Sequence, residues 1–429
     1  MYTPQRLFGE VGSAADLLSH EPFLERARMQ REQELDGSAR LALGGYVVAR
    51  LVDKLLLFES GADAFEGFRW QLDAVRHHIH DLPSDSPETA HLAGIVAAVP
   101  LGASPSSGLW LSLTAYAYFL ENEGRLEESL EVLTLAARSQ GAQTPIADFI
   151  AYALFAGRLN RLLARWDAAK ACYGAAEEAA TRSGDALAML RGRLGQGAVH
   201  RGQGNYPAAR AIAEGVARDA AEQQLVDAQA LAYADLGVIY SLQGLRLEAL
   251  EAQYRAFQLN HDPVQRMRAL GDLAIGLAEI GAYDAARIAF QIVADSTAGV
   301  LVRANALLEL MNLESVVGNR MAFERCRTEA EGQQSRMSPS MTVDYLYKVG
   351  TGLVRFGQRG RARKFLADAL GLAETHRLNG WYFKVEEAFQ QLEQPPAEAT
   401  SPPASELSDS PAVRDMERGL REYALASAG

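Results

Sequence analysis

The histidines near position 78 are the residues of this chain whose spacing best suits a metal ion. Residues 76–81 read RHHIHD, which places His77 and Asp81 one helical turn apart and His80 three residues after His77. The sequence has no second cluster with ligand spacing, and histidines near the end of a helix are also favoured by the helix dipole. We therefore expect a solvated helix end here, with no metal and no cofactor.

Two glycine pairs resemble parts of a nucleotide-binding loop. Gly195-Gln-Gly197 and Gly202-Gln-Gly204 each lack the third glycine of a dinucleotide fingerprint, and neither follows an expected strand. The sequence also contains no GxxxxGK phosphate loop, no HExxH zinc motif and no GxSxG nucleophile elbow. We interpret these glycines as packing residues. Because no motif in the sequence indicates a catalytic nucleophile or base, we expect a protein that is not an enzyme.

A group of arginines is the remaining feature that could bind a ligand. Arg158, Arg161, Arg191 and Arg201 stand out in a chain whose formal net charge is −12. A guanidinium group presents a planar fork of donors that suits carboxylate or phosphate oxygens. A charge-assisted hydrogen bond of this kind contributes about 1.5 to 3 kcal/mol where water is excluded. Whether these side chains lie together depends on the elements that carry them.

The spacing of small residues indicates that the arginines belong to a repeat array. A small residue ends one helical stretch and the next restarts at a fixed offset, with a step of 40 residues at first and 37 to 39 later. A second small residue stands seven positions before most turns, and an alanine often stands five positions after, so that paired helices can approach closely. This pattern is typical of helical hairpins that stack to bury their apolar faces. The turns fall at Gly124, Ala164, Gly204, Gly244, Gly281, Gly318 and Gly357.

The motif around these turns resembles the tetratricopeptide repeat (TPR) family over residues 109–393. The stretches GAVHRGQGNYPAA (residues 197–209) and AIGLAEIGAYDAARIAF (residues 274–290) match it closely. The family's usual period is about 34 residues, so the helices or loops here should be longer. The resemblance implies an all-α fold, a right-handed superhelical α-solenoid of TPR-like hairpins. It also implies that the first helices of successive hairpins line a concave groove that binds peptides or helices of other proteins.

The groove positions stand thirteen, ten, six and three residues before each turn, on one face of the first helix. Chaperone-binding members of the family hold a terminal carboxylate with Lys, Asn and Arg at the positions ten and six before the turn. Here those positions are mostly apolar, so we do not expect a chaperone-tail adaptor. The arginines instead predict a partner with acidic and apolar residues, unless they are solvated or paired with local glutamates. The candidate groove residues are Tyr118, Leu154, Arg158, Arg161, Arg191, Leu194, Arg201, Val238, Arg268 and Ile275, and the same offsets give Leu111, Glu121, Gly271 and Asn305.

Composition agrees with a helical, non-membrane protein. The chain has 429 residues, 48% of them hydrophobic and 22% charged, and alternating apolar runs that would mark strands are nearly absent. Its pI near 5.3 argues against general nucleic-acid binding, which needs a basic surface. The uncharged stretch 92–120 is interrupted by Pro100 and Pro105, which leaves pieces shorter than the roughly 20 residues of a membrane helix. Charged residues near the N-terminus disfavour a secretory signal.

The two cysteines suit a reducing compartment. Cys172 and Cys326 occupy the same repeat position about four units apart, out of reach of a disulfide in an extended stack. We interpret them as packing residues and expect a cytoplasmic protein.

Residues 1–99 are predicted to form an N-terminal helical region that caps the array. Within it, Ser38–Ser60 and Ala62–Leu82 form a long helical pair hinged at Gly61, which we interpret as a degenerate first hairpin. Further helices without the repeat motif are expected on either side of this pair.

Residues 109–393 are predicted to hold about seven repeats and a capping helix, Trp381–Leu392. Residues 394–411 are rich in Pro, Ser, Ala and Glu, which indicates a disordered linker. Residues 412–429 follow as a short terminal helix, with Ser410 and Pro411 as its cap and first position. Its apolar residues share one face and are expected to dock on another surface: Val413, Met416, Leu420 and Tyr423.

Three functions agree with these features. The first is a non-catalytic scaffold or adaptor that binds a protein or peptide in the groove. The second is a peptide-responsive regulatory sensor, because an N-terminal helical region followed by long repeats loosely resembles the bacterial Rap-type regulators. The third, weaker, is a self-associating module whose C-terminal helix docks into the groove of the same or a neighbouring chain, which gives autoinhibition or a homodimer. The sequence contains no evident DNA-binding helix-turn-helix, so we expect no direct contact with nucleic acid.

Overall fold

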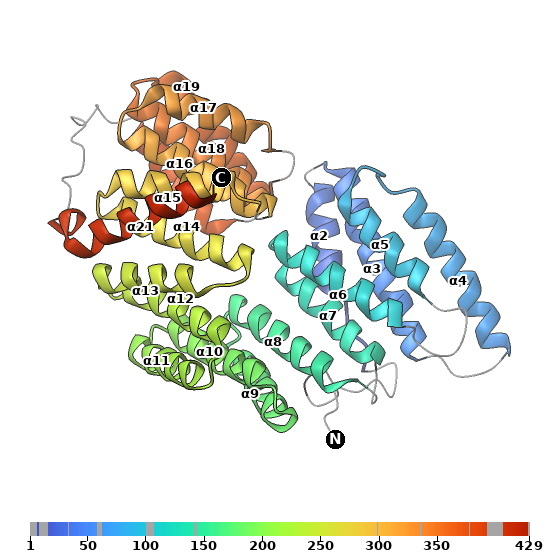
Figure 1. Cartoon of the computed structure of the whole chain (residues 1–429). Helices are drawn as coiled ribbons and strands as arrows, with labels where there is room; N and C mark the ends of the chain where they lie inside the picture. The colour runs from blue at the N-terminus through green and yellow to red at the C-terminus, as the bar shows by residue number, and fades with distance from the viewer. Residues whose placement is uncertain are drawn as a thin grey trace. The chain divides into compact units, whose positions relative to one another are not determined.

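The computed structural model describes residue 7 and residues 16–32, 34–57, 62–99, 107–140, 144–297, 299–334, 337–376, 378–392 and 406–427. The chain divides into two compact units, Met1–Asn205 and Tyr206–Gly429, which we call unit 1 and unit 2. Throughout the described part of the chain the regular elements are helices, without any strand (Figure 1). The expected all-α fold is confirmed.

Unit 1 consists of helices that pack mainly on their neighbours in sequence. The first four precede the repeats, the next four form two hairpins, and the last packs on the second hairpin. They are α2 (Glu21–Glu32), α3 (Asp36–Leu56), α4 (Ala62–His80), α5 (Pro87–Ala98), α6 (Ser107–Asn122), α7 (Leu126–Gln140), α8 (Ile146–Leu162), α9 (Trp166–Ser183) and α10 (Ala186–Gly202).

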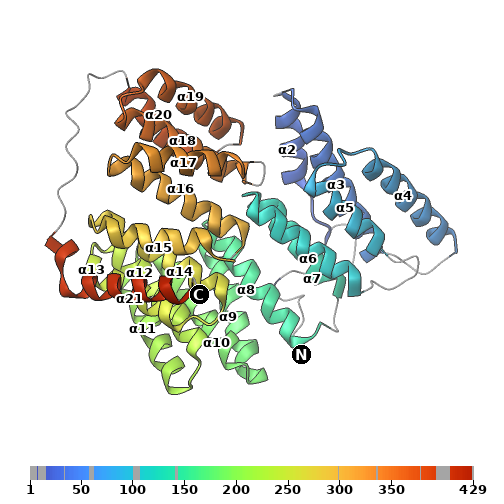
Figure 2. The same cartoon turned by 45° about the horizontal axis from the view of Figure 1, so that its top comes forward.

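Unit 2 continues the same pattern (Figure 2). Its helices are α11 (Tyr206–Glu222), α12 (Val226–Leu242), α13 (Arg246–Leu259), α14 (Pro263–Glu279), α15 (Tyr283–Asp295), α16 (Val300–Val316), α17 (Arg320–Glu331), α18 (Pro339–Arg355), α19 (Arg359–Thr375), α20 (Asn379–Gln391) and α21 (Pro411–Ser427), with the 3₁₀ helix η4 (Glu406–Asp409) before the last.

The seven predicted turn residues end the first helix of each hairpin in the same way. Each has a positive φ, for example 75° at Gly124 and 55° at Ala164. The amide of Gly124 donates to the carbonyl of Glu121, and the next amide, of Arg125, donates to Leu120 at 2.8 Å. This pair of bonds is a Schellman motif, which satisfies the last carbonyls of a helix and requires a left-handed residue. The TPR-like hairpins are therefore confirmed, while the handedness of a superhelix concerns both units together and stays a prediction.

Small residues allow the hairpins to pack closely, as the sequence predicted. A Cβ added to Gly157, seven positions before its turn, would lie 2.8 Å from the ring of Tyr173. One added to Gly195 would lie 2.2 Å from the same ring. The ring of Tyr173 thus occupies space that only glycine leaves open, and it is itself buried.

The N-terminal helices of unit 1 are joined to the first hairpin by buried charges. Glu88 of α5 accepts hydrogen bonds from Tyr116 of α6 and from Arg125 at 2.7 Å each, and Arg26 of α2 lies 3.0 Å away. Burial opposes ionisation of Glu88, but the guanidinium groups of Arg125 and Arg26 outweigh it and lower the pKa of Glu88 to about 2. An ionised carboxylate therefore ties three helices together.

A second buried cluster holds the segment before α2. His20 is fully buried, and its Nε2 lies 2.9 Å from Asp53 of α3 while its Nδ1 lies 3.0 Å from Glu131 of α7. Burial disfavours the charged imidazole, but the hydrogen bonds and charges of Asp53 and Glu131 together raise the pKa of His20.

Helices α3 and α4 correspond to the helical pair predicted before the repeats, whereas the hinge residue Gly61 lies outside the described residues, as do residues 100–106. The two compact units divide between residues 205 and 206, inside the repeat array. The domain boundaries expected near residues 99 and 109 stay a prediction.

The C-terminal helices pack as their apolar faces predicted. Helix α20 packs on α19 and α18, and α21 packs on α15, all within unit 2. Ser410 caps α21 by accepting the amide of Val413, and Pro411 is its first residue. Of the predicted linker, residues 394–405 lie outside the described residues and Glu406–Asp409 form η4. The buried face of α21 consists of Val413, Met416 and Leu420.

None of the described helices combines the length and apolar character that a membrane span requires.

Candidate functional site

The predicted groove residues lie on the first helices of their hairpins, divided between the two units. Three lie in unit 2, namely Val238 on α12 and both Arg268 and Ile275 on α14. The others are in unit 1, on α6, α8 and α10, and we call them the unit 1 face: Tyr118, Leu154, Arg158, Arg161, Arg191, Leu194 and Arg201.

An aromatic pair and a paired arginine form one end of the unit 1 face. The ring of Tyr118, which is 45% exposed, stacks on Phe155 with centroids 4.2 Å apart. The guanidinium group of Arg158 lies 4.8 Å from the centroid of Phe155 and makes a two-point ion pair with Glu121, with both contacts at 2.7 Å. Glu121 neutralises this arginine, which is the alternative that the sequence left open. Arg158 therefore orders the aromatic surface and contributes no free charge.

Two other arginines of the face keep donors available. The Nε of Arg161 is buried and has no hydrogen-bond partner within the described ranges. Arg191 is exposed, and it forms no ion pair with any described residue. An unsatisfied buried donor costs about 1 to 3 kcal/mol, which an incoming acceptor would recover. Arg201, by contrast, already has an interaction partner.

The leucines of the unit 1 face divide between surface and core. Leu154 is half-buried and packs on the cluster that contains Tyr173 and Val199. Leu194 is only 7% exposed and belongs to the core. Of the two, Leu154 is the one that adds apolar surface beside the arginines.

One of the three unit 2 residues, Arg268, lines a small cavity. Arg268 is exposed, while Val238 and Ile275 are half-buried. A cavity of about 300 Å³ is lined by Arg268 and by Gly271 and Asn305, which the same offset rule places in the groove. We call it the Arg268 pocket. Its volume is at the lower end of the range for ligand sites.

The other chemical candidates have structural explanations. The Nδ1 of His77 lies 2.7 Å from the carbonyl oxygen of Asp73 in its own helix. In the part of the chain that the structure describes, no three His, Cys, Asp or Glu side chains are grouped as metal ligands. Cys172 and Cys326 are free and buried, and burial raises the pKa of each thiol to about 11. Both thiols stay protonated at neutral pH, so they are poor nucleophiles.

Sequence reasoning missed two features of the candidate sites. Phe155 was not among the predicted groove residues, although it lies one position after Leu154 and stacks on Tyr118. A larger cavity beside the end of α21, lined in part by Tyr423, was also missed. The amphipathic face of α21 was the only sequence signal for that cavity.

No protein-family model matches the chain. No curated protein matches it either. The solved structures that it resembles include the apo form of RapI, at 10% sequence identity and a TM-score of 0.42, over 62% of this chain and 98% of that one. They also include a Rap protein complexed with Competence and Sporulation Factor, at 10% identity and a TM-score of 0.42, over 82% of this chain and 97% of that one. Because these likenesses are weak, the TPR-like assignment depends on the turns and helix pairs of this chain.

Proposed function

We propose that the chain is a non-catalytic scaffold that binds a protein segment with acidic and apolar residues through the unit 1 face. The observation that supports this most directly is that two arginines of this face, Arg161 and Arg191, form no ion pair with described residues, while the exposed ring of Tyr118 is stacked on the buried Phe155. Stacked rings offer apolar contact area at a low cost in conformational entropy. Arginine forks offer charge-assisted bonds to carboxylates. A segment that alternates acidic and apolar residues matches both parts.

The charge balance of the unit 1 face determines the sign of the charge that its partner should carry. Arg158 is neutralised by Glu121, so it adds no net attraction. Arg161 and Arg191 remain, and each charge-assisted bond contributes about 1.5 to 3 kcal/mol where water is excluded. Exposed charges are screened by salt, so binding should weaken as ionic strength rises.

The test uses a labelled twelve-residue peptide of alternating glutamate and leucine, with a control peptide that carries lysine in place of glutamate. Fluorescence anisotropy should detect binding of the acidic peptide only. The double variant Arg161→Gln, Arg191→Gln should weaken it by roughly 100-fold or more, because two bonds of at least about 1.5 kcal/mol each are lost and about 1.4 kcal/mol corresponds to tenfold. A matched double variant elsewhere in unit 1, Arg28→Gln with Arg182→Gln, removes the same charge from exposed residues on α2 and α9 and should bind as the unchanged protein does. Equal affinity for both peptides, or equal loss in both double variants, would contradict the proposal.

A second function, a peptide-responsive sensor, is supported by the Arg268 pocket in unit 2. A cavity of about 300 Å³ suits a side chain or the end of a short peptide better than a folded domain. The two functions differ in what the protein retains during purification from its own cells. A small soluble peptide identified by mass spectrometry would favour the sensor, and a stable protein would favour the scaffold. In both cases the Arg161→Gln, Arg191→Gln variant reports whether the unit 1 face is involved.

A further inference from the structure

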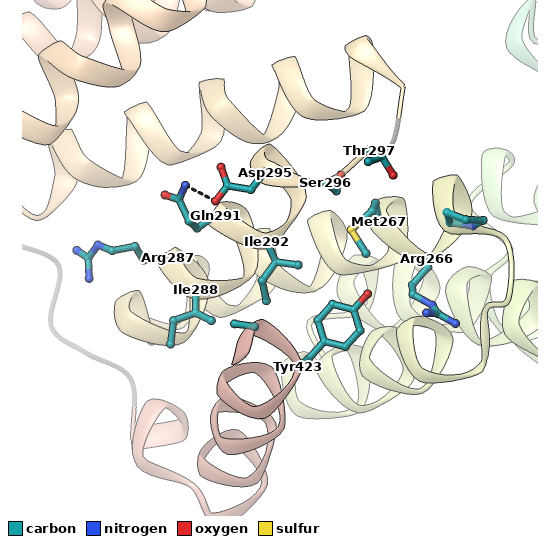
Figure 3. Close-up of a pocket in the computed structure, with 12 residues that line it drawn as sticks. Arg266, Met267, Arg287, Ile288, Gln291, Ile292, Asp295, Ser296, Thr297 and Tyr423 are labelled. Carbon is teal, nitrogen blue, oxygen red and sulfur yellow. Dashed lines mark hydrogen bonds between the residues drawn. The ribbon is translucent and has the colours of Figure 1, made fainter. Parts of the chain in front are cut away.

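A further cavity in unit 2 lies at the end of the terminal helix. It is lined by residues of α14, α15 and α21 and has a volume of about 660 Å³ (Figure 3). Ligand sites commonly measure 300 to 1,000 Å³. We call it the Tyr423 pocket. It shares Met267 with the Arg268 pocket but differs from both groove sites described above because the terminal helix α21 forms part of its lining.

The floor of the Tyr423 pocket is apolar. Ile288 and Ile292 of α15 and Met267 of α14 lie on one side, and the ring of Tyr423 reaches in from α21 (Figure 3). Phe257 of α13 holds that ring in an edge-to-face contact, with centroids 5.1 Å apart and planes at 75°. The aromatic wall is therefore fixed before any ligand binds.

One arginine of the pocket is uncommitted. The Nε of Arg266 donates to the carbonyl of Asn260 at 2.7 Å, and no ion pair of Arg266 is found among the described residues. Arg287, the other arginine of the lining, is neutralised by Glu314 at 2.6 Å and Asp284 at 2.7 Å.

The acidic residue of the lining is occupied and lies apart from Arg266. Asp295 accepts a hydrogen bond from Gln291 at 2.9 Å, and in the view of Figure 3 this pair and Arg266 lie on opposite sides of the pocket. The pocket therefore offers an apolar body with a single available cation at one end.

We propose that the Tyr423 pocket binds an apolar group that ends in a carboxylate, with the carboxylate on Arg266 and the apolar part over Ile288, Ile292 and Tyr423. A fatty acid and the C-terminus of an apolar peptide share this chemistry. Because Tyr423 and Ala424 form one wall, such a ligand contacts α21 only while that helix is docked. Ligand binding therefore stabilises docking of the C-terminal helix, by the linkage that couples any ligand to the state that binds it.

The test measures binding of decanoate, below its micelle concentration, to the full chain by calorimetry, with decanol as the neutral partner. Decanoate should bind at least 10-fold more tightly than decanol. Arg266→Gln should remove that preference, and Arg266→Lys should retain most of it. Ile292→Trp fills the pocket and should abolish binding of both. A tripeptide of leucine with a free carboxylate, compared with its C-terminal amide, distinguishes a fatty acid from a peptide end. If the natural ligand is a peptide end, the tripeptide acid binds in place of decanoate.

Asp295→Asn is the matched control, because it removes one charge from the same lining and should not weaken the binding of decanoate. Far-ultraviolet circular dichroism shows whether each variant is folded. Equal binding of decanoate and decanol, an unchanged preference in Arg266→Gln, or a loss in Asp295→Asn as large as that in Arg266→Gln would overturn the proposal. So would the absence of binding by both decanoate and the tripeptide acid.

Discussion

Replacing His20 should destabilise unit 1 in a way that depends on pH. The imidazole is fully buried between the carboxylates of Asp53 and Glu131, and the side chain of Asp53 is itself fully buried. His20→Gln leaves those carboxylates without a cation between them. Two arginines are the other charged groups around these carboxylates. The Nη1 of Arg50 lies 3.3 Å from Asp53. Burial lowers the pKa of Arg138, and the nearby carboxylate of Asp53 partly opposes that shift.

The size of the effect follows from the burial of Asp53. Removing one partner of a buried ion pair costs about 3 to 5 kcal/mol, because an uncompensated charge stays behind. For a unit of 150 to 250 residues, each kcal/mol shifts Tm by roughly 2 to 4 °C. If unit 1 unfolds cooperatively, the variant should therefore melt about 6 to 20 °C lower near pH 6.

The sign of the pH dependence follows from the direction of the pKa shift. The pKa of His20 is raised in the folded protein, so its stabilising contribution is complete below the unfolded value of 6.5. The contribution is lost as pH rises through the folded pKa. The difference in Tm between wild type and His20→Gln should thus be largest near pH 6 and shrink at pH 9.

Thermal unfolding followed by circular dichroism at both pH values measures this difference. The double variant His20→Gln, Asp53→Asn should recover part of the loss, since the two residues are coupled. His261→Gln is a control in unit 2, where the histidine is 70% exposed and its partner is Asp227. The reasoning is refuted if the His20→Gln difference is the same at pH 6 and pH 9, or if it stays below about 1 kcal/mol.

Two further predictions concern packing within each unit. Gly195→Ala should lower the free energy of unfolding by about 1 to 3 kcal/mol, because its Cβ would lie 2.2 Å from the ring of Tyr173. Gly174→Ala is the control, because its Cβ would meet nothing within 4 Å. Its free energy of unfolding, measured by denaturant titration, should rise by about 0.5 to 1 kcal/mol. A loss equal to that of Gly195→Ala would contradict the packing argument. Leu420→Asp should release α21, because it places a carboxylate at a fully buried position, and hydrogen exchange along α21 should rise. Leu425→Asp, at a residue that is 78% exposed, should leave exchange unchanged, and continued protection of α21 in Leu420→Asp would disprove the docking described.

Local patterns in the sequence predicted the hairpins because the hairpins depend on local geometry. A left-handed residue and a small residue seven positions earlier are both visible in one repeat, as at Gly204 and Gly197. The buried face of α21 was predictable for the same reason, since a helix places Val413, Met416 and Leu420 together wherever it docks. What α21 docks on is a property of three-dimensional packing and left no local signal.

The ion pairs of the candidate site and of the buried cluster around His20 were harder to predict because their partners lie far away in sequence. Arg158 and Glu121 are 37 residues apart, and His20 and Glu131 are 111 apart. Helical spacing places a side chain on a face, but the ionic partner that reaches it comes from a neighbouring helix. Offset rules therefore located the arginines without distinguishing the neutralised Arg158 from the available Arg161 and Arg191.

The turns of the array have a consequence for how such a protein can change in length. At Gly124, Gly204, Gly244, Gly318 and Gly357 an added Cβ would meet nothing within 4 Å, so glycine is favoured there by the positive φ and not by any neighbouring side chain. Ala164 occupies the same left-handed position with a Cβ, at a cost of about 1 kcal/mol that the surrounding helices tolerate. Each turn is thus encoded within its own hairpin. Duplication or deletion of one hairpin in the gene would carry a complete turn with it, and the remaining turns would need no compensating substitution.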